Sequence, residues 1–317
     1  MNDPAPTFRR FLTGGPEQLR LSHASMTLLA GYAMAVIVLR EAFGPGPGLG
    51  HVGAWQFRLL GAGGDVFVPL VTALVAARWL GSRLGVAAGV IQLTGLHVLG
   101  LPIDALWSDP WIGAMMAVAM AAFAWANVSG RLPPASGAGF PAAFYLSASL
   151  ILMFRGWGEF ASIPLACLAH LLLNQDGRAF RFLIHPIGLG VLAIFAGCTI
   201  WLHWPTTPQM VSFERCPFAT AAVGMLPWSP LCAVAVVVGC WRGHYATAFW
   251  QFVVCWSLSP LLLATVGALS DRSALAMTSA PLSILAAAGL DEAVLWWRRP
   301  RYGRTARTTF RTGRPGR

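Results

Sequence analysis

Charged residues are scarce in this chain, and they gather in the short segments between long apolar runs. Charged residues make up 11% of the 317 positions, with 12 acidic and 22 basic residues, and every basic residue is Arg. A carboxylate can exchange a proton with a substrate, and a guanidinium group can bind an anion. We therefore expect any chemistry where the two kinds of side chain converge. Every second segment between the runs supplies carboxylates: Glu41, Asp65, Asp104, Asp109, Glu159, Glu214 and Asp271.

The elements that must position these side chains are membrane helices. The chain is 56% hydrophobic, and its mean hydropathy is +0.62. A water-soluble globular domain has about a quarter of its residues charged, and a disordered chain has few apolar residues, so both classes are excluded. Because a bilayer offers the backbone no hydrogen-bond partners, the spanning segments must be helices. The fold class predicted is an all-α, polytopic membrane protein with about ten transmembrane helices.

Each spanning helix needs about 20 apolar residues, and the chain supplies ten such segments. They are approximately 21–40, 62–80, 84–101, 110–128, 140–154, 157–173, 184–204, 217–240, 246–268 and 273–297. The predicted organisation is a cytoplasmic N-terminal segment at 1–20, a transmembrane domain at 21–297 and a basic cytoplasmic tail at 298–317. Pro227 is expected to kink the eighth segment, because proline removes a helix hydrogen bond.

The distribution of Arg predicts the sidedness of these segments. With the N-terminus in the cytoplasm, 17 of the 22 Arg lie in cytoplasmic segments, as the positive-inside rule requires. An even number of crossings then returns the tail to the cytoplasm, where its eight Arg would contact anionic lipids. No motif supports nucleic-acid binding. The remaining Arg lie in external segments together with the carboxylates: Arg40, Arg58, Arg155, Arg215 and Arg272.

No residue pattern indicates a cofactor or a metal ion. The six Cys form no CxxC pair, and no HxxxH pair is present, so the sequence supports neither a disulfide framework nor a bound metal. A divalent metal ion is compatible with the chemistry discussed below but has no support here. His97, Gln92 and Thr94 fall inside the third apolar run. Polar groups at this depth can mark a transport pathway, and packing within the bundle is the simpler interpretation.

Six stretches, in order from about Trp55 to Leu290, resemble a known family. They are Arg78–Gly85 with Ile91–Thr94, Ser108–Trp111, Phe144–Gly156, Arg178–Leu183 before Pro186, Gly224–Pro230, and Ser270–Arg272 continuing to Pro281. This set resembles the protein O-mannosyltransferase and aminoarabinose transferase family of membrane glycosyltransferases, which has the C-type glycosyltransferase fold. The family usually has Lys where Arg155 stands.

The resemblance implies a function and a set of roles. It implies transfer of a sugar from a polyprenyl-phosphate donor to a lipid or protein acceptor on the external face of a membrane, here a bacterial inner membrane. A carboxylate would take the proton of the acceptor, and cationic groups would stabilise the lipid phosphate as it leaves. Asp109 and Glu41 are the candidate catalytic carboxylates. Arg155, Arg272 and Arg58 are the candidates for binding the donor phosphate.

Each candidate also has an interpretation without function. Arg40-Glu41 can mark the membrane interface, and Asp109 before Pro110 is suited to cap a helix. Arg155 can pair with Glu159 in the same turn. Arg272 can lie in a solvated turn in which Asp271 caps the last helix. Arg58 can face lipid headgroups, as can His51.

The chain also departs from the family pattern. The family typically has a long first external loop with an Asp-Glu pair, and here residues 41–64 contain no such pair and no Lys. The alternative prediction is therefore a catalytically inactive relative that acts as a lipid-binding or scaffold subunit. A transporter is a third interpretation, and it is less consistent with spans that are almost entirely apolar.

Overall fold

The computed structural model describes residues 54–95, 110–128, 139–175, 177–203, 216–241 and 247–309. It does not describe the side chains of residues 54–63, 271–272 and 298–309 or of a few others. Within the described stretches every regular element is a helix, which confirms the all-α prediction for this part of the chain. The first predicted span, 21–40, lies outside the described residues.

The helices follow the predicted apolar segments closely, although several ends differ by a few residues. They are α3 (Ala54–Leu80), α4 (Ser82–Thr94), α6 (Pro110–Asn127), α7 (Gly139–Arg155), α8 (Trp157–Asn174), α9 (Gly177–Leu183), α10 (Pro186–His203), α11 (Pro217–Gly224), α12 (Ser229–Trp241), α13 (Ala248–Thr265) and α14 (Asp271–Thr309). Three stretches are long and apolar enough to cross a membrane: Ala179–Trp201, Ala248–Thr265 and Ser273–Trp297. The total of ten crossings remains a prediction.

The eighth predicted segment, 217–240, is broken into two helices. The axes of α11 and α12 differ by 111°, and a turn that contains the cis Leu226–Pro227 peptide separates them. A proline cannot donate a backbone hydrogen bond, so this is a favourable place for the helix to break. Trp228 fixes the turn to α4, because its indole Nε1 donates to Thr94 Oγ1 at 2.9 Å. The expected kink is thus a complete break.

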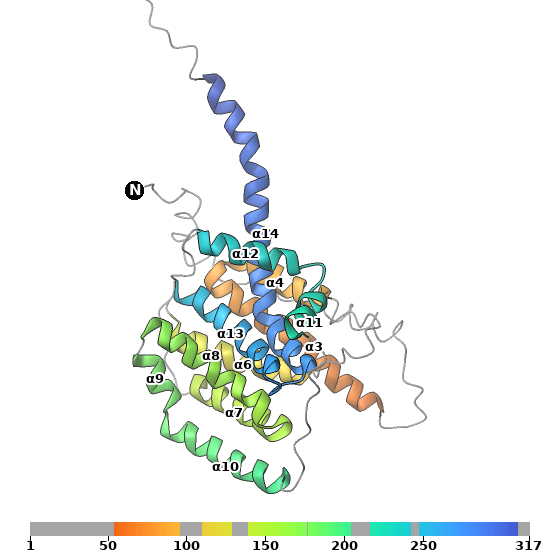
Figure 1. Ribbon diagram of the computed structural model, residues 1–317, viewed down its shortest axis with the longest axis vertical. Helices are drawn as coiled ribbons and strands as arrows, with labels where there is room; N and C mark the ends of the chain where they lie inside the picture. Colours follow the sequence, from red (N-terminus) through yellow and green to blue (C-terminus); the bar gives the residue numbers. More distant parts are fainter. Residues whose placement is uncertain are drawn as a thin grey trace, which may run out of the picture.

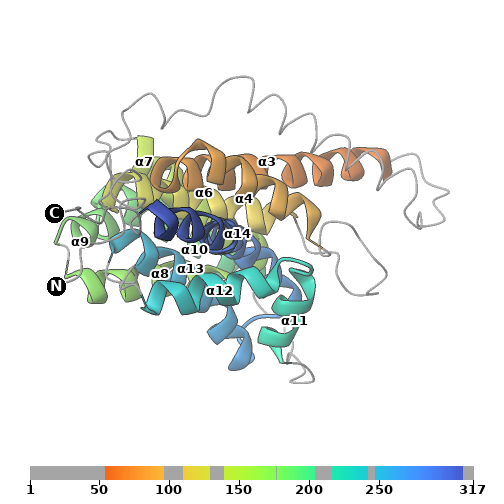
Figure 2. The same cartoon turned by 90° about the horizontal axis from the view of Figure 1, so that it is seen from above.

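Helix α14 forms the centre of the bundle (Figures 1 and 2). Its residues from Ser273 to Ala288 are almost all buried, and the helix then continues past the other helices to Thr309. In lipid, helices associate mainly through close van der Waals packing, which small residues favour. Gly289 illustrates this, because a Cβ atom there would lie only 2.0 Å from the carbonyl oxygen of Leu231 in α12.

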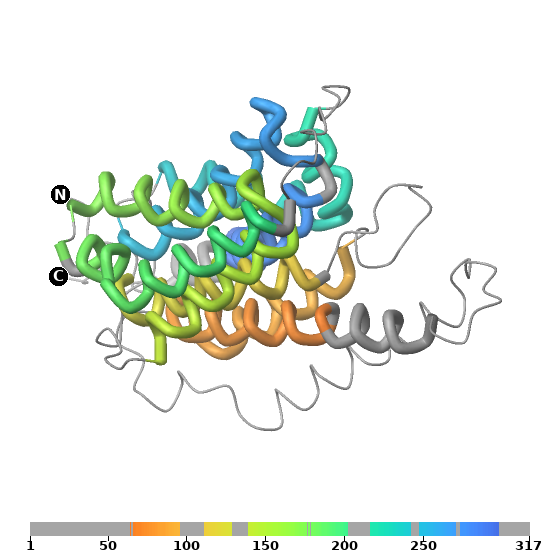
Figure 3. Tube along the Cα trace, turned by 90° about the horizontal axis from the view of Figure 1, so that it is seen from below, coloured from red at the N-terminus to blue at the C-terminus, as the bar shows by residue number. Residues whose placement is uncertain are grey.

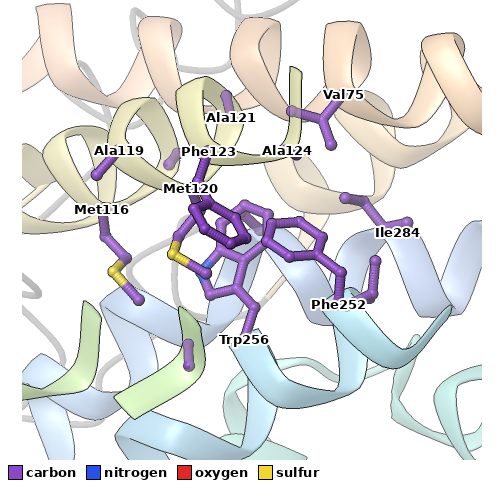
Figure 4. Close-up of a cluster of buried hydrophobic side chains, with 14 of the residues drawn as sticks. Val75, Met116, Ala119, Met120, Ala121, Phe123, Ala124, Phe252, Trp256 and Ile284 are labelled. Atoms are coloured by element: carbon purple, nitrogen blue, oxygen red, sulfur yellow. The ribbon is translucent and has the colours of Figure 1, made fainter. Parts of the chain in front are cut away.

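Large side chains fill the space between α6 and α13 beside this central helix. The rings of Phe123 and Phe252 are stacked with centroids 6.0 Å apart, and Trp256 lies 5.7 Å from Phe252. Met116 and Met120 of α6 pack around the indole (Figure 4). All five side chains are almost completely buried, so this cluster is part of the packed core of the bundle.

Helix α10 lies at the edge of the bundle against α7 (Figures 1 and 3). Gly188 allows the two helices to approach, because a Cβ atom there would be 2.1 Å from the ring of Tyr145. The hydroxyl of Tyr145 donates to the carbonyl oxygens of Phe182 and Leu183, which fixes the corner between α9 and α10. Most of the other side chains of α10 are exposed, as expected of a helix that faces lipid.

Candidate functional site

Two turns that are far apart in sequence meet at the end of the bundle where α14 begins. One is Arg155–Glu159, from the last residue of α7 to the first turn of α8, and the other is Val266–Arg272, from the end of α13 to the first residues of α14. We call them the paired turns. Gly158 brings them together, because a Cβ atom at this position would lie 2.1 Å from the carbonyl oxygen of Ala268. Gly156 has a φ of 97°, a conformation that L side chains rarely adopt, and it reverses the chain between the two helices.

A chain of hydrogen bonds also joins the paired turns to the first turn of α14. Ser270 Oγ accepts a bond from the backbone N–H of Ser273 at 3.1 Å, and the two hydroxyls are 3.0 Å apart. The hydroxyl of Ser273 donates to Glu159 Oε1 at 2.9 Å. Ser270 therefore caps α14, whereas the side chain of Asp271, the residue expected to do so, is not described. Glu159 thus makes a bond to another helix. The local pair with Arg155 that the sequence suggested stays a prediction.

The beginning of α6 lies at the same end of the molecule. A Cβ atom on Gly113 would be 3.0 Å from the carbonyl oxygen of Ala276, so the first turn of α6 lies beside the start of α14. Helix α6 begins at Pro110, directly after Asp109. Asp109 and Glu41 themselves lie outside the described residues, and their proposed roles remain predictions.

The structure brings together the turns that carry two of the three Arg candidates. Arg155 is the last residue of α7, and its side chain is exposed. The backbone of Arg272 lies in the first turn of α14, next to Ser273, although its side chain is not described. An exposed guanidinium group is suited to bind an anion, and the positive end of the dipole of a long helix attracts one.

Arg58 lies further along the bundle. Val68 of α3 is near the contact between α6 and α14, since its Cγ2 atom would be 3.8 Å from a Cβ on Gly113. Arg58 precedes Val68 by ten residues in the same helix, which corresponds to about 15 Å along the helix axis. The structure does not describe the side chain of Arg58, and its contact with the donor phosphate remains a prediction.

The polar residues in the third apolar run bind other helices. Gln92 accepts a hydrogen bond from the hydroxyl of Thr72 in α3 and donates to Ser279 Oγ in α14 at 3.1 Å. Thr94 accepts the bond from Trp228 described above. Gln92 and Thr94 thus both hold neighbouring elements together, while His97 lies outside the described residues.

Sequence reasoning missed Ser273 and the interhelical role of Glu159. The sequence contains one usable signal, because Ser270 and Ser273 have the spacing at which a capping hydroxyl meets the N3 residue of a helix. The partner of Ser273 on α8 could not be found in this way, since it is 114 positions away. Among the described residues, no three His, Cys, Asp or Glu gather as a metal ion would require.

Comparison with known proteins connects this arrangement to one solved fold. Two crystal structures of ArnT from Cupriavidus metallidurans match 87% of this chain with a TM-score of 0.60 and 19% sequence identity; one is bound to undecaprenyl phosphate and the other is in the apo state. The chain matches 56% and 55% of the length of those two chains, so it spans just over half of ArnT. No family model matches the sequence. The chain therefore shares the fold of just over half of the ArnT chain.

Proposed function

We propose that this chain is a membrane glycosyltransferase that uses a sugar donor linked to polyprenyl phosphate. The observation that supports this proposal is the meeting of the turns of Arg155 and Arg272 in a fold shared with a protein that binds undecaprenyl phosphate. In this proposal the two guanidinium groups bind the donor phosphate on the external face of the membrane. Arg58 approaches the same headgroup from α3.

The reaction requires a base and a stabilised leaving group. In the proposed mechanism Asp109, directly before α6, or Glu41 takes the proton from an acceptor hydroxyl or phosphate as its oxygen attacks the anomeric carbon. The bond between the sugar and the phosphate breaks, and negative charge grows on the polyprenyl phosphate. Arg155 and Arg272 stabilise that charge, and Arg suits this role because its planar group can bind two phosphate oxygens at once. The acceptor is a lipid or a protein.

Substitution of Arg155 tests the proposal directly. The purified protein in nanodiscs should bind undecaprenyl phosphate, and Arg155→Ala should weaken binding about tenfold or more, the value of one hydrogen bond to a charged group. Arg155→Lys should retain much of the affinity, because it keeps the positive charge. Arg83→Ala is the matched control, because Arg83 is also exposed but lies in the first turn of α4, outside the paired turns. Equal affinity in the wild type and in Arg155→Ala would contradict the proposal.

A second function is favoured by the first external segment. Residues 41–64 have no Asp-Glu pair, which the family that the chain resembles typically has there. An inactive relative that binds lipid or supports a partner would bind undecaprenyl phosphate and transfer no sugar. Incubation with donors labelled in the sugar separates the two functions: transfer that is lost in Asp109→Asn supports the enzyme, and phosphate binding without transfer from any donor supports the subunit.

A further inference from the structure

Glu159 is an acidic residue at a place where the proposed function requires positive charge. It follows Arg155 by four residues in the same turn, and it lies on the side of that turn that faces α14. A carboxylate near a bound phosphate repels it, so electrostatics alone predicts that Glu159 weakens the binding of the lipid. The contacts of Glu159 indicate a different contribution.

The carboxylate completes a contact that continues along α8 and α14. One turn further along α8, the hydroxyl of Ser162 donates to the backbone carbonyl of Glu159 at 2.6 Å and lies 3.5 Å from the sulfur of Met277 in α14. Ser162, Met277 and Ser273 are buried, whereas Glu159 is only partly buried. The bond between Glu159 and Ser273 therefore joins a partly exposed carboxylate to a buried hydroxyl of α14, at the place where the paired turns meet.

This bond links the segment that carries Arg155 to the segment that carries Arg272. On one side, Glu159 is connected to Arg155 through the three residues of a tight turn that includes Gly156 and Gly158. On the other side, Ser273 is the neighbour of Arg272 in the first turn of α14. Separation of the two side chains would remove the side-chain hydrogen bond between the α7–α8 turn and the start of α14.

We propose that Glu159 is a positioning residue that holds the turn of Arg155 against the start of α14 through Ser273, so that both Arg-bearing segments bind the same phosphate. This inference rests on the proposed function. It assigns Glu159 no contact with the lipid. In this view the benefit of a fixed spacing between the two cationic segments exceeds the repulsion between the carboxylate and the phosphate.

Glu159 has two opposite effects on binding: its charge repels the phosphate, and its bond to Ser273 positions the turn of Arg155. Two variants can separate these effects. Binding of undecaprenyl phosphate is measured in nanodiscs made of zwitterionic lipid. Glu159→Ala removes both the charge and the acceptor, and we expect about tenfold weaker binding. Glu159→Gln removes the charge but keeps an oxygen that Ser273 can donate to, and we expect binding at or above the wild-type level. Tighter or unchanged binding in Glu159→Ala would overturn the inference.

Ser273 supplies the matched variant and the control for folding. Ser273→Ala removes the donor with little change of volume, and it should weaken binding as much as Glu159→Ala does. The double variant should be no weaker than either single variant, because both remove the same contact. Additive losses would show that the two residues act separately and would contradict the inference. Thermal unfolding of each variant in detergent verifies that the bundle is intact.

A distance measurement separates failure of this inference from failure of the proposed function. Trp157 and Val266 are exposed on the two turns and can be replaced by spin-labelled Cys in a background without native Cys. We expect a narrow distance distribution that broadens in Glu159→Ala and stays narrow in Glu159→Gln. An unchanged distance distribution in Glu159→Ala overturns the positioning role, irrespective of the result of the lipid-binding measurement. If the wild type binds no polyprenyl phosphate, the proposed function fails. The hydrogen bond between Glu159 and Ser273 then has no role in binding the donor.

Discussion

At the scale of single residues, the candidate site depends on side chains that are small or absent. A Cβ on Gly158 would collide with the backbone of Ala268, and a backbone oxygen cannot move aside as the end of a flexible side chain can. By contrast, nothing lies within 4 Å of the Cβ position of Gly197 in α10. Both glycines lie in helices, and their structural roles are opposite.

Alanine substitution should distinguish these glycines. We expect Gly158→Ala to destabilise the protein by about 1–3 kcal/mol and to weaken phosphate binding, because the paired turns must separate. Gly197→Ala should be neutral or stabilise by up to about 1 kcal/mol, since alanine favours a helix. Thermal unfolding in detergent and phosphate binding measure both effects. Similar behaviour of the two variants would mean that the close approach at Gly158 contributes nothing.

At the scale of elements, α14 organises the bundle through contacts that need no large polar group. Its buried hydroxyls mostly donate to carbonyls of the same helix, as Thr278 does to Ala274 and Ser283 to Ser279. Such bonds satisfy a hydroxyl in lipid without a partner helix. The same holds around Gln92, because Thr72 can donate to Val68 O and Ser279 to Ala276 O. Loss of Gln92 would therefore leave both hydroxyls with an acceptor.

Gln92→Met should consequently be a mild substitution. We expect a loss of about 1 kcal/mol or less in the free energy of unfolding, as found for polar contacts between membrane helices. Binding of undecaprenyl phosphate should stay unchanged, because Gln92 contacts only α3 and α14 by side-chain hydrogen bonds. Unfolding by detergent titration and lipid binding provide the measurements. A large loss of binding with normal stability would restore Gln92 as a candidate for a pathway through the bundle.

At the scale of the whole molecule, the break between α11 and α12 decides the sidedness of everything after it. If the two helices form one broken span, the chain crosses the membrane there. If they form a re-entrant loop, it returns to the side from which it came, and the tail moves to the opposite side. Helix α12 alone has 13 residues and is about 20 Å long, less than the hydrocarbon thickness of about 30 Å.

Two native cysteines can test this topology. Cys216 precedes α11, Cys240 lies near the end of α12, and both are exposed. In variants that retain only one of them, we expect a membrane-impermeant maleimide to label Cys216 in intact cells and Cys240 only after lysis. Labelling of both from outside would indicate a re-entrant loop and an odd number of crossings. A Cys at position 317 should then become accessible as well.

The sequence by itself determined the class of this protein and the course of most of its helices. An apolar run must form a helix in lipid because its backbone has no other partner, so the segment 140–154 predicts α7 and 246–268 predicts α13 from composition alone. Order along the chain also placed Arg155 and Arg272 in turns at the same predicted face. Local chemistry indicated that Pro227 would disturb its helix.

Tertiary structure decided which turns are neighbours. No pattern within residues 155–159 indicates that Gly158 meets Ala268 or that Glu159 binds Ser273, because a contact across more than a hundred positions depends on how complete helices pack. Apolar periodicity carries little information in a membrane, where lipid and protein interior are equally apolar. The close approach allowed by Gly158 and the hydrogen bond of Ser273 therefore hold the two turns together.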